Sequence, residues 1–270
     1  MTEEKKDNTK VKFMLEKMGR DVEELRSSDA WTAMLRVQAK FHRYSASNQL
    51  MIWMQREDAT QVAGFRQWQS MGRQVQKGEK SIKIFAPMTK KDEVGETKIF
   101  GFKLVSVFDI SQTKGDPVPR MEWPETTGEC DGLFDQLAEQ VERMGLTIQI
   151  VPAHHEGLSP TARGWFTPST KIISVRETGE AQMCSTLLHE VGHANDPLLS
   201  SDDDRGRKEL VAESVSYVLG LRYGLDVVDE VTHYLASWRG GVDELLAVVD
   251  RVKQSVQRFD DALVLEAVAA

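Results

Sequence analysis

One short stretch, Leu-Leu-His-Glu-Val-Gly-His-Ala at residues 187–194, constrains this chain more than any other. If the stretch is helical, His189 and His193 leave the same face one turn apart and can bind one metal ion. Zinc is the ion we expect, with another divalent metal as the alternative, because imidazole and carboxylate ligands satisfy it. Glu190 is not required as a ligand, and in a His-Glu-x-x-His site this glutamate accepts the proton of the water that attacks a carbonyl. The stretch therefore predicts a hydrolytic metal site.

The alternative is a chance match of the motif on an ordinary helix. Leu187, Leu188 and Val191 flank the two histidines and predict that this helix is buried. Burying two histidines and a carboxylate without partners would be costly. We therefore favour the metal site.

The length of the chain, 270 residues, suits one large domain or two ordinary ones. The first eight residues are polar, and no eighteen consecutive residues are apolar, so we expect neither a signal peptide nor a membrane partner. Cys130 and Cys184 are too few for a disulfide framework, which agrees with a reducing compartment. A cytoplasmic protein is expected.

The charge is divided unevenly along the chain. Residues 1–120 hold 22 Lys and Arg against 16 Asp and Glu, a formal charge of +6, whereas residues 121–270 carry −14. A basic half beside an acidic half suggests that the first half meets an anionic polymer.

The first half is predicted to begin with three helices. Apolar residues recur at intervals of three and four over residues 11–25, residues 27–29 offer N-caps for a second helix, and a third runs from about 45 to 57. In the third helix, Leu50, Trp53 and Met54 form an apolar stripe that we expect to pack in the core.

Residues 62–108 show a different pattern. Residues 62–73 are predicted to form one short helix closed by Gly72, and residues 81–87 and 99–108 two strands joined as a hairpin. Seven basic residues lie between positions 66 and 91 against one acidic residue, interleaved with Phe65, Trp68 and Phe85. A run of this kind could be a solvated face, or it could track a phosphate backbone and offer rings to bases, and composition leaves both interpretations open.

A longer series of residues resembles a known family. The series consists of Trp31 and Met34-Leu35, then Tyr44-Ser45-x-x-Asn48-Gln49-Leu50, then Ala59-Thr60-x-Val62-Ala63-Gly64-Phe65-x-x-Trp68, then Gly72-Arg73-x-Val75-x-Lys77-Gly78-Glu79-Lys80-x-Ile82. Over residues 28–108 it is similar to the N-terminal domain of ArdC-type antirestriction proteins. The resemblance implies a domain that binds single-stranded DNA, followed by a zinc-dependent, protease-like domain. The residues expected to contact DNA are Asn48, Arg66, Trp68, Arg73, Lys77, Lys80 and Lys83.

A linker is predicted at residues 111–128, which are rich in Pro, Gly and polar residues. We expect a helix over residues 133–144, a strand over 147–151, and a hairpin formed by 164–166 and 171–175. The pair His154-His155 is interpreted as part of an exposed loop rather than as ligands.

The second half resembles zincin-like proteases, which place an edge strand above the metal. An extended peptide could pair with such a strand. Gly164, Trp165 and Phe166 are the residues we expect to line the substrate groove.

A third metal ligand is needed, and it is sought downstream of the histidines. No His-x-x-Gly-x-x-His continuation follows, which argues against a metzincin. Glu209 and Glu213 lie four apart on the next predicted helix, similar to the gluzincin pattern. That resemblance implies that Glu209 binds the metal and that Glu213 orients a ligand histidine, although the order could be reversed. Two solvated surface carboxylates are the alternative.

Together these observations predict two α+β domains, a basic single-stranded-DNA-binding domain at 1–120 and a zincin-like metallopeptidase domain at 121–270. The leading hypothesis is a DNA-associated zinc metallopeptidase that hydrolyses peptide bonds, with single-stranded DNA and a protein substrate, which could itself be DNA-bound, as partners. It could protect incoming DNA from restriction. The rival is a non-enzymatic protein that binds single-stranded DNA and carries a structural or vestigial metal site. The intact Glu190 favours the enzyme, because a structural site does not need that carboxylate.

Overall fold

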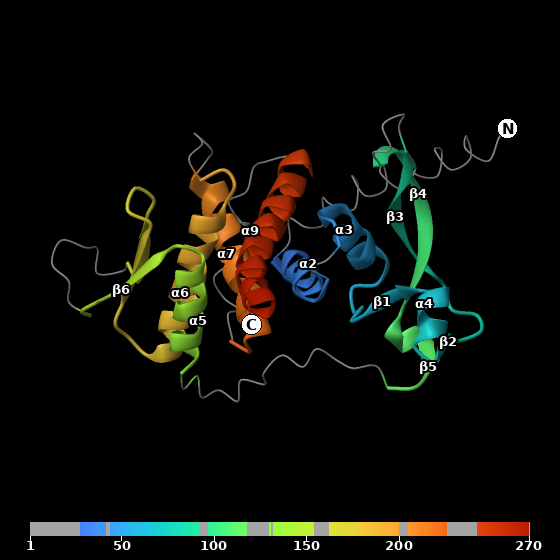
Figure 1. The fold of residues 1–270 in the computed structure, drawn as a ribbon, viewed down its shortest axis with the longest axis horizontal. Coiled ribbons are helices and arrows are strands. Elements are labelled where there is room, and N and C mark those ends of the chain that lie inside the picture. Colours follow the sequence, from blue (N-terminus) through green and yellow to red (C-terminus); the bar gives the residue numbers. More distant parts are fainter. Residues whose placement is uncertain are drawn as a thin grey trace. The chain divides into compact units, whose positions relative to one another are not determined.

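The computed structural model describes residues 28–41, 44–91, 97–117, 130, 132–153, 162–199, 205–225 and 242–269. The chain divides into two compact units, residues 1–121 and 122–270 (Figure 1). The helix predicted at residues 11–25 and the pair His154-His155 lie outside the described residues.

Two helices open the described part of the first unit. Helix α2 spans Ser28–Lys40 and helix α3 spans Ala46–Gln55. The side chain of Ser45 caps α3 by accepting a hydrogen bond from the backbone N–H of Asn48 at 3.3 Å. The predicted core stripe of α3 is confirmed for Leu50 and Trp53, which are buried, whereas Met54 is half-buried.

A three-stranded antiparallel sheet follows, in the order β1-β4-β3. Its strands are β1 (Val62–Gly64), β3 (Ile82–Lys91) and β4 (Thr97–Asp109), so the predicted hairpin is confirmed. The prediction of one helix over residues 62–73 was wrong at its start, because only α4, Phe65–Ser70, is helical. The carboxylate of Asp109 accepts hydrogen bonds from the backbone N–H groups of Thr60 and Gln61 at 2.7 and 3.0 Å, which draws β1 onto β4.

The first part of the predicted linker is also ordered. A 3-10 turn, η2 (Ile110–Gln112), is closed by a capping box between Asp109 and Gln112. Strand β5 (Thr113–Gly115) then pairs with β2 (Arg73–Val75). Residues 110–115 therefore belong to the first unit, whereas residues 118–129 lie outside the described residues.

Strand β3 lies at an edge of its sheet, and two side-chain amides of α3 cover that edge. The amide of Asn48 donates to the carbonyl of Phe85 at 2.9 Å and accepts from its N–H at 2.7 Å. Gln55 does the same at Lys83, at 2.8 and 2.9 Å. Each amide therefore satisfies one pair of backbone groups that a sheet edge leaves open.

The second unit combines a small mixed sheet with four described helices. Strand β8 (Ile172–Arg176) lies between β6 (Thr147–Val151), which is parallel to it, and β7 (Gly164–Thr167), which is antiparallel. The helices are α5 (Leu133–Arg143), α6 (Glu180–Asn195), α7 (Arg205–Arg222) and α9 (Val242–Ala269). The predicted helix near 133–144 and the strand at 147–151 are confirmed, and the histidine motif lies on α6.

Helix α9 holds the C-terminal end of α6. Asp196, the residue after α6, forms a buried ion pair with Arg251, whose Nε lies 3.0 Å from Oδ1. Arg258 donates to the carbonyl of Asn195 at 2.6 Å, and the amide of Asn195 donates to the carbonyl of Ser255 at 3.2 Å. The helix that carries the histidines is therefore fixed at its end. None of the described helices is long and apolar enough to cross a membrane.

Candidate metal centre

Two helices bring three potential ligands together. The Nε2 atoms of His189 and His193, both on α6, lie 3.1 Å apart. Oε2 of Glu209, on α7, lies 3.5 Å from Nε2 of His189 and 3.4 Å from Nε2 of His193. A tetrahedral ion with ligand bonds of about 2.0–2.1 Å separates its ligand atoms by about 3.3 Å. The donor set and its spacing therefore fit a zinc-sized divalent ion.

A close contact between the helices makes this arrangement possible. A Cβ atom on Gly192 would lie 2.7 Å from Cα and 2.9 Å from the carbonyl oxygen of Ala212. Gly192 lies next to His193 on α6, and Ala212 lies between Glu209 and Glu213 on α7. Only glycine at position 192 lets α7 approach closely enough for its carboxylates to reach the histidines.

Glu213 contacts the other side of His189. Its Oε1 lies 3.3 Å from Nδ1 of His189, so this nitrogen can donate a hydrogen bond to the carboxylate. When the ring is neutral, Nε2 of His189 is then left without a proton and can face Glu209 and an ion. This geometry is consistent with Glu209 as ligand and Glu213 as the residue that orients His189, and both roles stay predictions.

The protonation of the site depends on these contacts. Burial lowers the pKa of His189, but hydrogen bonds to Glu209 and Glu213 and the charges of Glu213 and Glu190 raise it to about 10. The same hydrogen bonds, from His189 and His193, hold the pKa of Glu209 far below its usual range. Without an ion, the site is thus an imidazolium surrounded by carboxylates, and an ion must displace that proton.

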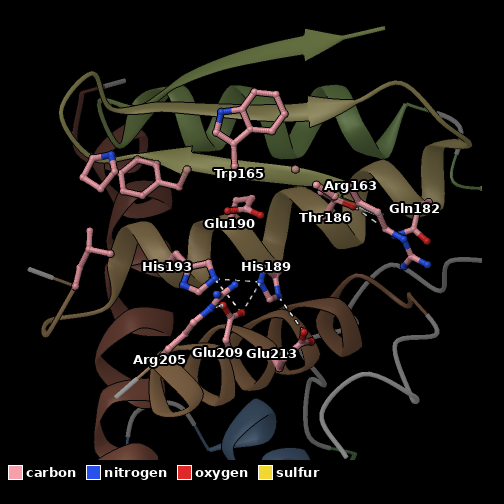
Figure 2. Close-up of a pocket in the computed structure, with 15 residues that line it drawn as sticks. Arg163, Trp165, Gln182, Thr186, His189, Glu190, His193, Arg205, Glu209 and Glu213 are labelled. Atoms are coloured by element: carbon pink, nitrogen blue, oxygen red, sulfur yellow. Dashed lines mark hydrogen bonds and ion pairs between the residues drawn. The ribbon is translucent and has the colours of Figure 1, made fainter. Parts of the chain in front are cut away.

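Glu190 faces a different neighbour. Figure 2 shows the two histidines on the side of α6 that faces Glu209 and Glu213, and Glu190 on the side that faces Trp165. Glu190 is only 6% exposed, and burial raises its pKa, against the opposing charges of His189 and His193. The backbone N–H of Phe166 also donates a hydrogen bond to it.

Strand β7 lies directly on α6. A Cβ atom on Gly164 would lie 2.6 Å from Cγ2 of Thr186, 2.8 Å from the carbonyl oxygen of Ser174 and 3.4 Å from Cγ of Glu190. Glycine at this position therefore brings β7 against the side chain of Glu190. Among the strands that the structure describes, β7 pairs with β8 alone.

A pocket of about 870 Å³ opens between β7, α6 and the start of α7. Gly164, Trp165 and Phe166 line it together with the histidines and all three glutamates, and their contact with a substrate stays a prediction. Sequence reasoning did not identify the other polar residues of its lining, which are Arg163, Gln182, Thr186 and Arg205. Arg205 lies one helical turn before Glu209, with Nε 3.7 Å from Oε1, so its i to i+4 spacing was a usable signal.

The residues expected to contact DNA differ in their exposure. Arg66, Lys77 and Lys80 are exposed. Lys83 is half-buried, and its Nζ donates to Oγ of Ser106 at 2.6 Å. These four lysines and arginines remain available to an anion, but they come from different elements.

Two of the expected DNA contacts, Trp68 and Asn48, are corrected by the structure, and Arg73 is half-buried and has partners within the first unit. Trp68 is 0% exposed and its indole donates to the carbonyl of Phe108 at 2.8 Å, so its ring cannot stack on a base. Asn48 is buried, and its amide is occupied by the edge of β3. The guanidinium of Arg73 connects β2 to β5. Its Nε donates to Oγ1 of Thr113 at 2.8 Å, and its other nitrogens donate to the carbonyls of Thr113, Gly115 and Asp116. Each of these side chains therefore stabilises the first unit.

Comparison with known proteins shows similarity to one antirestriction factor. Residues 12–108 match the family model of the N-terminal domain of anti-restriction factor ArdC. Two crystal structures of the antirestriction protein ArdC from plasmid R388 are similar in fold at 21% identity. The match to the metal-free form has a TM-score of 0.55 and covers 82% of this chain and 86% of the R388 chain. The match to the Mn(II)-bound form has a TM-score of 0.56 and covers 81% of this chain and 84% of the R388 chain.

A curated relative, an uncharacterized protein of Bacillus anthracis, is 26% identical over 82% of this chain. The chain spans only 45% of the length of that relative.

Proposed function

We propose that this chain is an ArdC-type antirestriction protein that binds single-stranded DNA with its first unit and hydrolyses peptide bonds with a metal centre in its second. The match of residues 12–108 to the ArdC N-terminal domain supports the first activity. The observation that carries the second is the convergence of His189, His193 and Glu209 beside the buried carboxylate of Glu190.

His189, His193 and Glu209 would hold the ion, as two imidazole nitrogens and one carboxylate oxygen. Three protein ligands leave room for a water, as in catalytic zinc sites, and such an ion acidifies a water and polarises a carbonyl. Zinc is our expectation. Manganese is the alternative, because the R388 protein has a Mn(II)-bound structure and mixed nitrogen and oxygen ligands accept that ion.

Glu190 acts as the general base in this proposal. It accepts a proton from the attacking water and later returns it to the leaving amine. Its raised pKa makes it a stronger base than an exposed glutamate, and the N–H of Phe166 fixes its orientation. The substrate backbone would extend along the side of β7 that faces away from β8 and add a strand to the sheet, which places its carbonyl in the pocket.

The test compares the purified protein with Glu190→Gln, in metal analysis and in protein-cleavage assays with and without single-stranded DNA. The amide keeps the shape of the carboxylate but cannot accept a proton. We expect both proteins to bind one ion per chain and only the unmutated protein to cleave, with DNA-bound proteins among the substrates tested. Equal cleavage by Glu190→Gln would refute the role of Glu190.

The second candidate is a non-enzymatic protein that binds single-stranded DNA, with a structural or vestigial metal site. The location of the family match within the first unit favours it. It predicts DNA binding and antirestriction that survive Glu190→Gln unchanged, and no cleavage of any protein under conditions in which the ion is bound.

A further inference from the structure

The β1-β4-β3 sheet of the first unit has one covered face. Ile82 pairs with Val107 across β3 and β4, and both side chains are buried, as is Ile84. Cross-strand partners share a face and alternate residues along a strand share it too, so these residues mark the face that meets the core. The second face of such an antiparallel sheet is usually polar.

The second face of this hairpin is instead apolar. On it, Phe85 pairs with Leu104 and Pro87 with Phe102, and beyond a bulge Ile99 is the partner of Thr89. Phe102 is 49% exposed and Ile99 is 59% exposed. We call Phe85, Pro87, Ile99, Phe102 and Leu104 the open face. Phe100, at the bulge, is 59% exposed as well. Exposed apolar side chains gathered in this way mark a binding surface.

The charge around the open face is positive. Lys83 lies on the same face, since its Nζ contacts Oγ of Ser106, the residue opposite it. Lys90 and Lys103 are exposed on the reverse of the same two strands. Within the described residues of β3 and β4, Asp109 is the sole carboxylate, and it is buried and hydrogen-bonded. An anionic partner would therefore meet no repulsion from the described residues of these two strands.

We propose that single-stranded DNA lies on the open face, with bases stacked on Phe102 and its apolar neighbours and with phosphates near Lys83. This placement rests on the proposed function of the first unit. It keeps Lys83 among the expected DNA contacts and assigns the main stacking contact to Phe102, which the sequence pattern does not single out. Bases of a single strand expose their faces to rings, whereas those of a duplex are stacked on each other. Lys90 and Lys103 add attraction, because charges act over about 10 Å at 0.1 M salt.

The test measures binding of the full chain to a fluorescently labelled oligothymidylate by anisotropy, with a duplex as comparison. Phe102→Ala should weaken binding to the single strand by about 5- to 150-fold, the range for the loss of one stacked base. Phe102→Tyr keeps a ring and should bind within about twofold of the unmutated protein. Ile150→Ala removes an equally exposed apolar side chain from β6 of the second unit and should also bind normally.

A second measurement does not depend on whether Phe102→Ala folds. Photocrosslinking of an oligonucleotide that contains iododeoxyuridine should label a peptide from residues 97–109 of the unmutated protein. The placement would be overturned if Phe102→Ala bound single strands as tightly as the unmutated protein, or if crosslinks formed only in other segments. Either result would leave DNA binding by the protein intact. The open face would then fit an acidic protein better. Failure of the unmutated protein to bind single strands would overturn the DNA-binding part of the proposed function and this occupant together.

Discussion

Replacing Gly192 by alanine should weaken metal binding far more than it weakens the fold. The new methyl group would lie 2.7 Å from Cα of Ala212, whereas an ordinary contact begins at 3.4 Å, so α6 and α7 must separate by roughly 0.7 Å. The two histidines come from α6 and Glu209 comes from α7. Ligand distances in metal sites tolerate about 0.2 Å. Glu209 would therefore move out of bonding range.

The expected magnitudes separate the two effects. Overpacking costs about 1–3 kcal/mol, but alanine is better than glycine inside a helix by about 1 kcal/mol. The free energy of unfolding of the metal-free protein should therefore fall by at most about 2 kcal/mol. Metal affinity should fall by more than the roughly 10–100-fold that accompanies removal of a residue that only orients a ligand.

Calorimetric metal titration and urea unfolding in a chelator measure the two quantities. Gly179→Ala is the matched control, because Gly179 precedes α6, has a φ of −62° and has open space where the methyl group would go. Alanine is a poor N-cap, so this control should lose up to about 1 kcal/mol of stability but no metal affinity. If Gly192→Ala bound metal as tightly as the unmutated protein, the contact between Gly192 and Ala212 would not position Glu209.

Three further predictions concern the ligands, the protonation of the site and the basic surface. Glu209→Ala should reduce metal affinity severely in titrations, whereas Glu213→Ala should cost about 10–100-fold; the opposite ranking would exchange their roles. The pKa of His189 is raised from its ordinary value of 6.5 to about 10, and that of Glu209 is lowered from its ordinary value of 4.5. The metal-free protein should therefore be most stable between pH 4.5 and pH 6.5. Its stability should be lost as the pH rises through about 10 or falls through the lowered pKa of Glu209. Urea unfolding at several pH values checks this, and a flat profile would contradict it. Neutralising Lys77 and Lys80 should lower the slope of log affinity for single strands against log salt by about 0.7 for each phosphate that these lysines neutralise in the complex; an unchanged slope would show that both are solvated.

The cluster of His189, His193 and Glu209 was predictable because much of its geometry is local. The four-residue spacing of His189 and His193 places both on one face of any helix, and the same argument applies to Glu209 and Glu213. Only the meeting of the two helices is a tertiary fact, and the glycine that permits it gave no signal in a single sequence. Burial of Gly192 against Ala212 depends on which faces of α6 and α7 pack together.

The proposed DNA contacts were less predictable because composition does not report burial. Trp68 and Phe102 are both aromatic residues within basic surroundings, yet one is in the core and the other is on the surface. Asn48 lies in the series that resembles ArdC, but its amide serves the fold. A polar residue can be needed for packing as much as for binding, and the two uses look alike until the partners of the side chain are known.

The pairing of Asn48 and Gln55 with β3 also affects how the protein behaves among copies of itself. An edge strand is a template for any extended chain, and β3 and β7 each lie at the edge of a described sheet. At residues 83 and 85 the two amides occupy the backbone groups of β3, so a strand from another molecule cannot dock there without displacing them. Asn48 and Gln55 thus block strand addition at β3, whereas β7 stays open to the strand addition proposed for the substrate. Asn48→Leu should leave the metal centre intact and make the protein self-associate.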